Sequence, residues 1–204
     1  MLVSDRTAVP ESLKRLAASR RLPWLLLALP AAPMLWPVLA GDEPWRHAIA
    51  PSGLFAAQLV AAALAVSPLR AIFPRSGLVT WMQRHRRALG VAAFCYGVVH
   101  LLAFVMAIGR LDYILQGLAF ASMQTGWAAF LLILPVAAIS SDFAMRRLGP
   151  WWKRVQRLVY PVAILTLAHW LLLVPSPVTP LVWCGAVAAL QLLRLWKARR
   201  SSGG

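Results

Sequence analysis

Long apolar stretches alternate with short polar connections along this chain, and six of them are long enough to span a membrane. The apolar runs cover residues 22–40, 51–69, 88–108, 124–141, 157–174 and 178–196. A membrane-spanning helix needs about 20 mostly apolar residues, because the hydrocarbon core of a bilayer is about 30 Å thick. The pattern therefore predicts an all-α fold, a polytopic membrane helix bundle with six transmembrane helices.

We expect one six-helix transmembrane domain at residues 22–198, between a basic cytoplasmic segment at 1–21 and a cytoplasmic tail at 199–204. The first run is the least regular. Its basic flank, apolar centre and small-residue end also fit a cleaved signal peptide. Its apolar part is long for such a peptide, which favours a retained first helix. Three prolines are expected to kink that helix: Pro30, Pro33 and Pro37.

The distribution of charge decides what the chain's basic character means. The 204 residues are 60% hydrophobic and carry a formal net charge of +15, which by itself would suit a nucleic-acid partner. All Lys and Arg residues except Arg46 and Arg110 fall in four blocks: Arg6 to Arg21, Arg70 to Arg87, Arg146 to Arg157, and Arg194 to Arg200. Basic blocks that alternate with nearly uncharged connections are typical of cytoplasmic loops. We therefore expect no nucleic-acid partner, both termini in the cytoplasm, and outer connections at 41–50, 109–123 and 175–177.

Two histidines lie inside the apolar runs, where polar groups are costly and usually functional. His100 follows Arg87 by 13 residues in the third run, and His169 follows Arg157 by 12 residues in the fifth. At about 1.5 Å per helical residue, these separations become roughly 20 and 18 Å. Both runs lead from the cytoplasm outward, so we expect the two imidazoles at nearly the same depth, in the outer half of the membrane.

Two imidazoles at one depth in apolar surroundings are typical of an axial haem site, since haem iron takes a nitrogen above and below a flat macrocycle. Two protein ligands leave no open position, which favours electron transfer over oxygen activation. Zinc fits less well, because a tetrahedral site needs further ligands and the apolar runs contain no Asp or Glu. The alternative is that each histidine only donates a hydrogen bond to a neighbouring helix.

Two segments carry a resemblance to a known family: RRALGVAAFCYGVVH at 86–100 and AMRRLGPWWKRVQRLVYPVAILTLAHW at 144–170, with support from AVSPLRAI at 65–72. They resemble the MsrQ (YedZ) family, part of the ferric-reductase-like transmembrane group, and the resemblance extends over about residues 22–198. It implies a haem b subunit of the bacterial inner membrane. Such a subunit takes electrons from quinone or a cytosolic flavin reductase and passes them to a periplasmic molybdopterin-containing methionine sulfoxide reductase, supporting the repair of oxidised periplasmic proteins. FMN is a further cofactor that the resemblance implies.

The chain departs from this family at Gln156, which stands where the family usually has a histidine. In ferric-reductase-like proteins that position ligates a second haem, and Arg86 or Arg87 occupies the expected partner position. We therefore expect one haem, with His85 as the residue that would substitute in a second site. Arg86 and Arg87 are candidates for a haem propionate or flavin phosphate, because arginine binds such anions through paired hydrogen bonds, although both also serve as topology anchors. His47 is a candidate for contact with a propionate, a quinone headgroup or the partner, or else a plain interfacial histidine.

Two other functions remain open. The first is a haem anchor of the cytochrome b561 or hydrogenase type for another redox partner. The second is a small transporter or membrane chaperone. A transporter would need further charged residues inside the spans and paired broken helices, and the sequence has neither apart from its prolines. The chain also has no GxGxxG segment after a strand that would bind a nicotinamide cofactor. We therefore expect an electron-transfer subunit rather than a self-contained enzyme.

Overall fold

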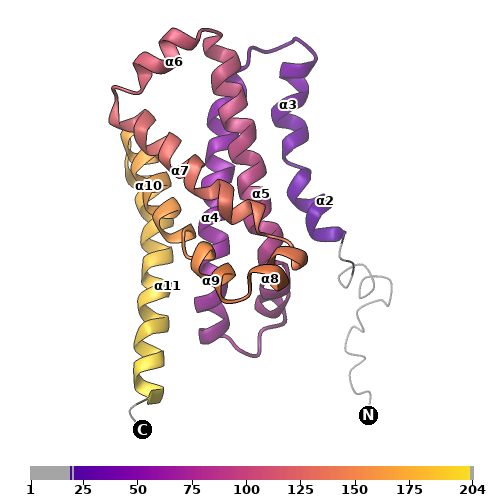
Figure 1. The fold of residues 1–204 in the computed structure, drawn as a ribbon, viewed down its shortest axis with the longest axis vertical. Coiled ribbons are helices and arrows are strands. Elements are labelled where there is room, and N and C mark those ends of the chain that lie inside the picture. Colours follow the sequence, from indigo (N-terminus) through magenta and orange to yellow (C-terminus); the bar gives the residue numbers. More distant parts are fainter. Residues whose placement is uncertain (1–18, 20, 203–204) are drawn as a thin grey trace, which may run out of the picture.

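The computed structural model describes residues 19 and 21–202. The other residues of the predicted N-terminal segment and tail (1–18, 20, 203 and 204) lie outside the described residues. The described part of the chain is helical and contains no strand. The helices are α2 (Leu22–Ala28), α3 (Ala31–Leu39), α4 (Arg46–Ile72), α5 (Gly77–Ile108), α6 (Leu111–Gly117), α7 (Ala121–Ala138), α8 (Asp142–Leu148), α9 (Pro150–Gln156), α10 (Val159–Leu173) and α11 (Val178–Ser202) (Figure 1).

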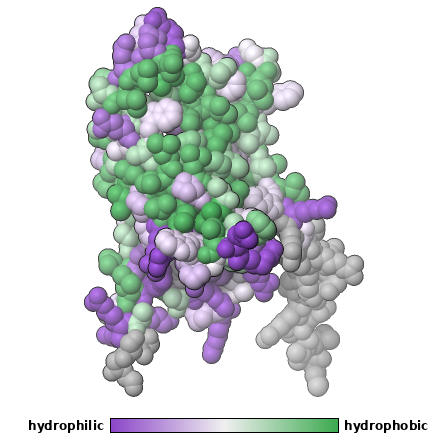
Figure 2. All heavy atoms as spheres, in the orientation of Figure 1, coloured by the Kyte–Doolittle hydropathy of each residue, from purple (hydrophilic) through white to green (hydrophobic). Residues whose placement is uncertain are grey.

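The prediction of a polytopic helical membrane bundle is confirmed. Among the described residues, five segments are long and apolar enough to cross a membrane: Arg46–Ile72, Gly77–Ile108, Ala121–Ala138, Pro150–Leu173 and Val178–Arg200. The pair α2 and α3 is bent by 45° and makes a sixth if it forms one span. Figure 2 shows the corresponding surface, a hydrophobic band between two hydrophilic ends.

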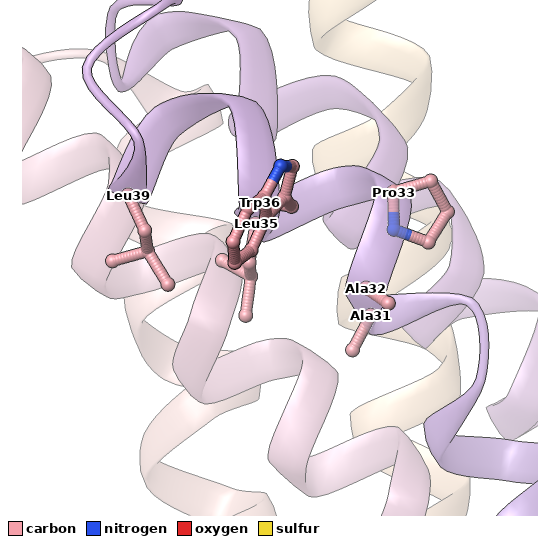
Figure 3. Close-up of a pocket in the computed structure, with 6 residues that line it drawn as sticks. All are labelled: Ala31, Ala32, Pro33, Leu35, Trp36 and Leu39. Atoms are coloured by element: carbon pink, nitrogen blue, oxygen red, sulfur yellow. The ribbon is translucent and has the colours of Figure 1, made fainter.

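The bend between α2 and α3 falls at Pro30, the residue before the first turn of α3. Proline has no N–H to donate and its ring clashes with the preceding turn, so a helix breaks or kinks there. The hydroxyl of Tyr96 donates to the Leu27 carbonyl at 2.9 Å and fastens α2 to α5. The outer side of α3 is an apolar groove without charged groups, lined by Ala31, Ala32, Pro33, Leu35, Trp36 and Leu39 (Figure 3). Its composition suits lipid tails and offers no chemistry.

The most extensive helix contact joins α4 and α5, while α7 packs on α10 and α11 packs on α4. The main core cluster lies between α4 and α5 and contains Leu59, Val60, Leu64, Ala92, Ala93 and Tyr96. Small residues such as Ala92 and Ala93 let two helices approach closely, which is how membrane helices gain packing energy. Helix α5 is capped at both ends. The Ser76 hydroxyl accepts the N–H of Val79, and Gly109 ends the helix in the left-handed conformation with φ 64°.

Three short helices were not predicted from the sequence. Helix α6 lies at one end of the bundle, and α8 and α9 lie at the other (Figure 1). Helix α8 begins after Ser141, whose hydroxyl accepts the N–H of Ala144 at 3.0 Å. An ion pair between Arg87 and Asp142 fastens α8 to α5. Helix α11 runs through Ser202, so its last turn includes the start of the predicted tail.

Candidate functional site

A cavity of about 490 Å³ lies inside the bundle between α4, α5, α7 and α10. Apart from His100, His169, Thr166 and two indoles, its walls are glycine and apolar side chains. The lining extends roughly 15 to 17 Å along the bundle, because each helix contributes residues ten or eleven positions apart: Ile49 and Val60, Ala93 and Phe104, Met123 and Ile133, Val162 and Leu173. Apolar cavities of this size with a few polar groups are typical of small-molecule and cofactor sites.

The structure brings His100 and His169 together across this cavity. Their ring centroids lie 6.1 Å apart, and the ring planes make an angle of 83°. The histidines come from α5 and α10, which both lead from the end with α8 and α9 towards the end with α6 (Figure 1). His100 lies 13 residues after Arg87 and His169 lies 12 residues after Arg157, and the two rings meet at one level of the bundle.

Each imidazole is held through Nδ1 by a backbone carbonyl of a neighbouring helix. Nδ1 of His100 lies 2.8 Å from the Ile49 oxygen of α4, and Nδ1 of His169 lies 2.6 Å from the Ser122 oxygen of α7. A carbonyl only accepts, so each Nδ1 donates and carries the single proton of the neutral ring. No hydrogen bond within the described part of the chain engages either Nε2. Both rings therefore keep a lone-pair nitrogen that can bind a metal.

Two glycines make this placement possible. A Cβ atom at Gly53 would lie 2.6 Å from Nδ1 of His100, and one at Gly126 would lie 2.7 Å from Cε1 of His169. Non-bonded heavy atoms pack best at about 3.5 to 4.0 Å, so any larger residue at either position must displace the ring. Each glycine also lies four residues after the carbonyl that accepts from the same histidine, so one helical turn supplies both the contact surface and the acceptor. Nothing in the sequence alone distinguishes these two glycines from the others.

The other predicted candidates, His47, His85 and Gln156, do not line the cavity. Nδ1 of His47 is 2.7 Å from a carboxylate oxygen of Glu43, and both side chains are about half exposed. Nε2 of Gln156 donates to the Val136 carbonyl at 3.4 Å. Nδ1 of His85 contacts the Trp81 carbonyl of its own helix at 2.9 Å. In the described residues, the end of the bundle with α8 and α9 therefore has no second pair of facing imidazoles.

The two predicted arginines hold helices together at that same end. Nε of Arg86 donates to the Ala63 carbonyl of α4 at 2.9 Å. Arg87 pairs with Asp142 of α8. Their expected contacts with a propionate or a flavin phosphate stay predictions, because the structure places both side chains in contacts between helices.

The geometry of the histidine pair fits a haem ligated on both faces. With metal–nitrogen bonds of about 2.05 Å and a nitrogen about 1.15 Å from its ring centroid, two opposed imidazoles on one metal have centroids roughly 6.4 Å apart. The observed separation is 6.1 Å. Within the described range, no three His, Cys, Asp or Glu side chains come together as a metal site, so side chains alone offer only two ligands. A porphyrin supplies the other four, and its apolar faces match the cavity walls.

A membrane helix bundle with two imidazoles 6.1 Å apart in the wall of one apolar cavity has the features of a ferric-reductase-like transmembrane protein. The family model described as "Ferric reductase like transmembrane component" matches residues 52–167. This segment includes Gly53, His100 and Gly126, and it ends two residues before His169.

Comparison with known proteins narrows the assignment to one family within this group. Over 168 residues the chain is 34% identical to the "Protein-methionine-sulfoxide reductase heme-binding subunit MsrQ" of Xanthomonas oryzae pv. oryzae, which covers 79% of this chain and 75% of that protein. It is 35% identical over 200 residues to the protein of the same name from Azospira oryzae, with 95% of this chain and 84% of that protein covered. The chain belongs to the MsrQ family. No solved structure matches it.

Proposed function

We propose that this protein is the haem b membrane subunit of a methionine sulfoxide reductase system, and that it carries electrons across the bacterial inner membrane to a periplasmic molybdopterin enzyme. The observation that carries the proposal is the pair of imidazoles 6.1 Å apart across an apolar cavity. The relatives are named as heme-binding subunits, which supports the choice of cofactor. We propose a single haem, ligated by His100 and His169.

The residues of the chain have distinct tasks in this proposal. A bound haem supplies one-electron transfer at its iron. His100 and His169 would both hold the haem iron, which would leave it no free position for dioxygen or a substrate. The Nδ1–H bonds to the Ile49 and Ser122 carbonyls fix the tautomer and orientation of the rings. The apolar walls keep water away from the site, which affects the reduction potential.

We also propose an orientation for the bundle. The end with α8 and α9 carries the basic blocks from Arg70 to Arg87 and from Arg146 to Arg157. Basic residues concentrate on cytoplasmic loops, so this end faces the cytoplasm and α6 faces the periplasm. The histidine pair then lies in the half of the membrane nearer the periplasmic partner. The electron donor is membrane quinone or a flavin reductase on the cytoplasmic side.

Electron delivery to the partner tests this function. Reduction of methionine sulfoxide to methionine and water takes two electrons and two protons. The purified protein is reduced in lipid vesicles and then mixed with the periplasmic molybdopterin enzyme of the same organism and methionine sulfoxide. We expect the reduced haem spectrum to decay only when enzyme and sulfoxide are both present, and methionine to form in proportion to the electrons lost.

Methionine sulfone, which such an enzyme does not reduce, serves as the matched control substrate. A haem that stays reduced in the complete mixture would contradict the proposed partner. If it is instead oxidised by another redox protein, the chain belongs with the alternative haem anchors.

A further inference from the structure

Hydroxyl side chains stand directly before both glycines of the candidate site. Ser52 precedes Gly53 on α4, and Thr125 precedes Gly126 on α7. The Ser52 hydroxyl donates to the Ala48 carbonyl and lies 3.1 Å from the Ile49 oxygen. The Thr125 hydroxyl lies 2.9 Å from the oxygens of both Ala121 and Ser122. Each hydroxyl therefore shares one proton between two successive carbonyls.

One carbonyl of each pair is also the acceptor of a histidine. The Ile49 oxygen accepts from Ser52 and from Nδ1 of His100, and the Ser122 oxygen accepts from Thr125 and from Nδ1 of His169. The same pair of contacts to one carbonyl, from a hydroxyl and from an imidazole, thus occurs twice, on different pairs of helices. The local sequences, IAPSG at 49–53 and SMQTG at 122–126, share only the hydroxyl residue and the glycine.

Ordinary helix behaviour accounts for only half of this arrangement. Serine and threonine in helices commonly donate to the carbonyl four residues earlier. Thr80 on α5 does so, and so does Ser140 just after the end of α7. Their hydroxyls donate to the Ser76 and Val136 carbonyls, and Arg70 also donates to the Thr80 hydroxyl. Among the helical hydroxyls that the structure describes, the additional contact three residues back belongs to Ser52 and Thr125. In both cases it reaches the carbonyl that a histidine uses.

A carbonyl oxygen that receives several donors is a weaker acceptor for each of them. The Ile49 and Ser122 oxygens already accept a helix N–H. The added hydroxyl donor therefore weakens the hydrogen bond that each oxygen accepts from the imidazole N–H. A weaker hydrogen bond from Nδ1–H to the carbonyl makes Nε2 a weaker electron donor, because the hydrogen bond at one ring nitrogen sets the basicity of the other. A weaker axial donor stabilises ferric iron less, and this raises the reduction potential.

We propose that Ser52 and Thr125 are positioning residues that raise the reduction potential of the haem by weakening the hydrogen bonds from His100 and His169 to the Ile49 and Ser122 carbonyls. This inference rests on the proposed haem site. The two hydroxyls act through separate carbonyls on separate ligands, so their effects on the potential add.

The test compares hydroxyl variants of the full chain in detergent or lipid vesicles. Ser52→Ala and Thr125→Val remove the hydroxyls, Ser52→Thr and Thr125→Ser keep them, and Ser140→Ala removes a hydroxyl that contacts no histidine acceptor. At a fixed applied potential, we expect each removal to shift the ferric-to-ferrous ratio about two- to tenfold towards ferric, with a larger shift in the double variant. The hydroxyl-keeping variants and Ser140→Ala should titrate like the parent. The near-infrared charge-transfer band of the ferric haem, which responds to hydrogen bonding of the ligands, should move with the potential.

The outcomes separate this inference from the proposed function. A parent protein without haem would defeat the proposed function itself. A parent with haem whose potential is unchanged in Ser52→Ala and Thr125→Val, or is raised, would overturn the role of the hydroxyls and leave the haem site standing. An equal shift in Ser140→Ala would also overturn it. Should one removal variant lose its haem, the other decides, because the two hydroxyls lie on different helices.

Discussion

Replacing either site glycine by alanine should weaken cofactor binding while leaving the fold intact. In Gly53→Ala the new Cβ would lie 2.6 Å from Nδ1 of His100, and in Gly126→Ala it would lie 2.7 Å from Cε1 of His169. Relief of these contacts to about 3.5 Å requires the ring to retreat by roughly 0.8 to 0.9 Å. The acceptor carbonyl lies on the same helix as the glycine, so the retreat also stretches the Nδ1 hydrogen bond.

The size of the effect follows from that displacement. His100 starts 2.8 Å from its carbonyl, and a bond stretched beyond about 3.2 Å contributes little. Loss of the partner that orients a metal-binding histidine typically reduces metal affinity about 10- to 100-fold. We expect haem affinity to fall by that factor in each variant. Without haem the ring is free to turn aside, so the overpacking cost to the fold should stay at or below about 1 to 3 kcal/mol.

Haem titration of the purified apoprotein, followed by the Soret absorbance, measures this affinity. Gly90→Ala is the matched control, because it lies on α5 and its Cβ would meet no atom within 4 Å. Alanine in place of a helical glycine stabilises by about 0.5 to 1 kcal/mol, so this variant should bind haem like the parent. Unchanged affinity in both Gly53→Ala and Gly126→Ala would refute the argument, as would an equal loss in Gly90→Ala.

Three further predictions concern ring orientation, haem number and topology. Because the imidazole planes make an angle of 83°, the ferric protein should give a highly anisotropic low-spin EPR signal. The rhombic EPR signal that parallel rings give would contradict this ring orientation. Gln156→Ala should leave the spectrum and one haem per chain unchanged, since the Gln156 amide donates to the Val136 carbonyl and does not line the cavity. Two haems by pyridine haemochrome, one of them lost in His85→Ala, would show a second site. Cysteines at Asp42 and Asp112 should react with an impermeant maleimide from the periplasmic side, and a cysteine at Ser141 should not, because the basic blocks face the cytoplasm. The reverse labelling pattern would overturn the proposed orientation.

Hydropathy was sufficient to predict the helical bundle, because the thickness of the membrane sets the length of each span. Counting residues from Arg87 and Arg157 placed His100 and His169 at one depth, and the structure has them at one level of the bundle. The rotation of each helix about its axis was beyond such counting. Gly53 and Gly126 contact imidazoles, whereas Gly90 and Gly97 would meet no atom with a Cβ, and nothing in the hydropathy of a glycine separates the two cases. The Ser-Gly and Thr-Gly pairs are a sequence signal only once the facing histidines are known.

Neighbouring residues of one helix also took separate roles that the sequence did not show. Arg86 and Arg87 form one basic pair in the sequence, but successive helical residues point about 100° apart, since a turn has about 3.6 residues. Arg86 accordingly reaches α4, and Arg87 reaches Asp142 of α8. The short helices α6, α8 and α9 were not predicted because seven residues fall below the length that an apolar window detects.

The reduced-minus-oxidised spectrum of the purified protein, with haem counted per chain, tests the central claim most directly. We predict a sharp alpha band of low-spin haem b in the parent at one haem per chain. In His100→Ala and in His169→Ala the haem should be lost or become high-spin, because the lining of the cavity contains no third histidine to replace either ligand. A parent protein without an alpha band, or a low-spin haem that persists unchanged in His100→Ala, would contradict the account.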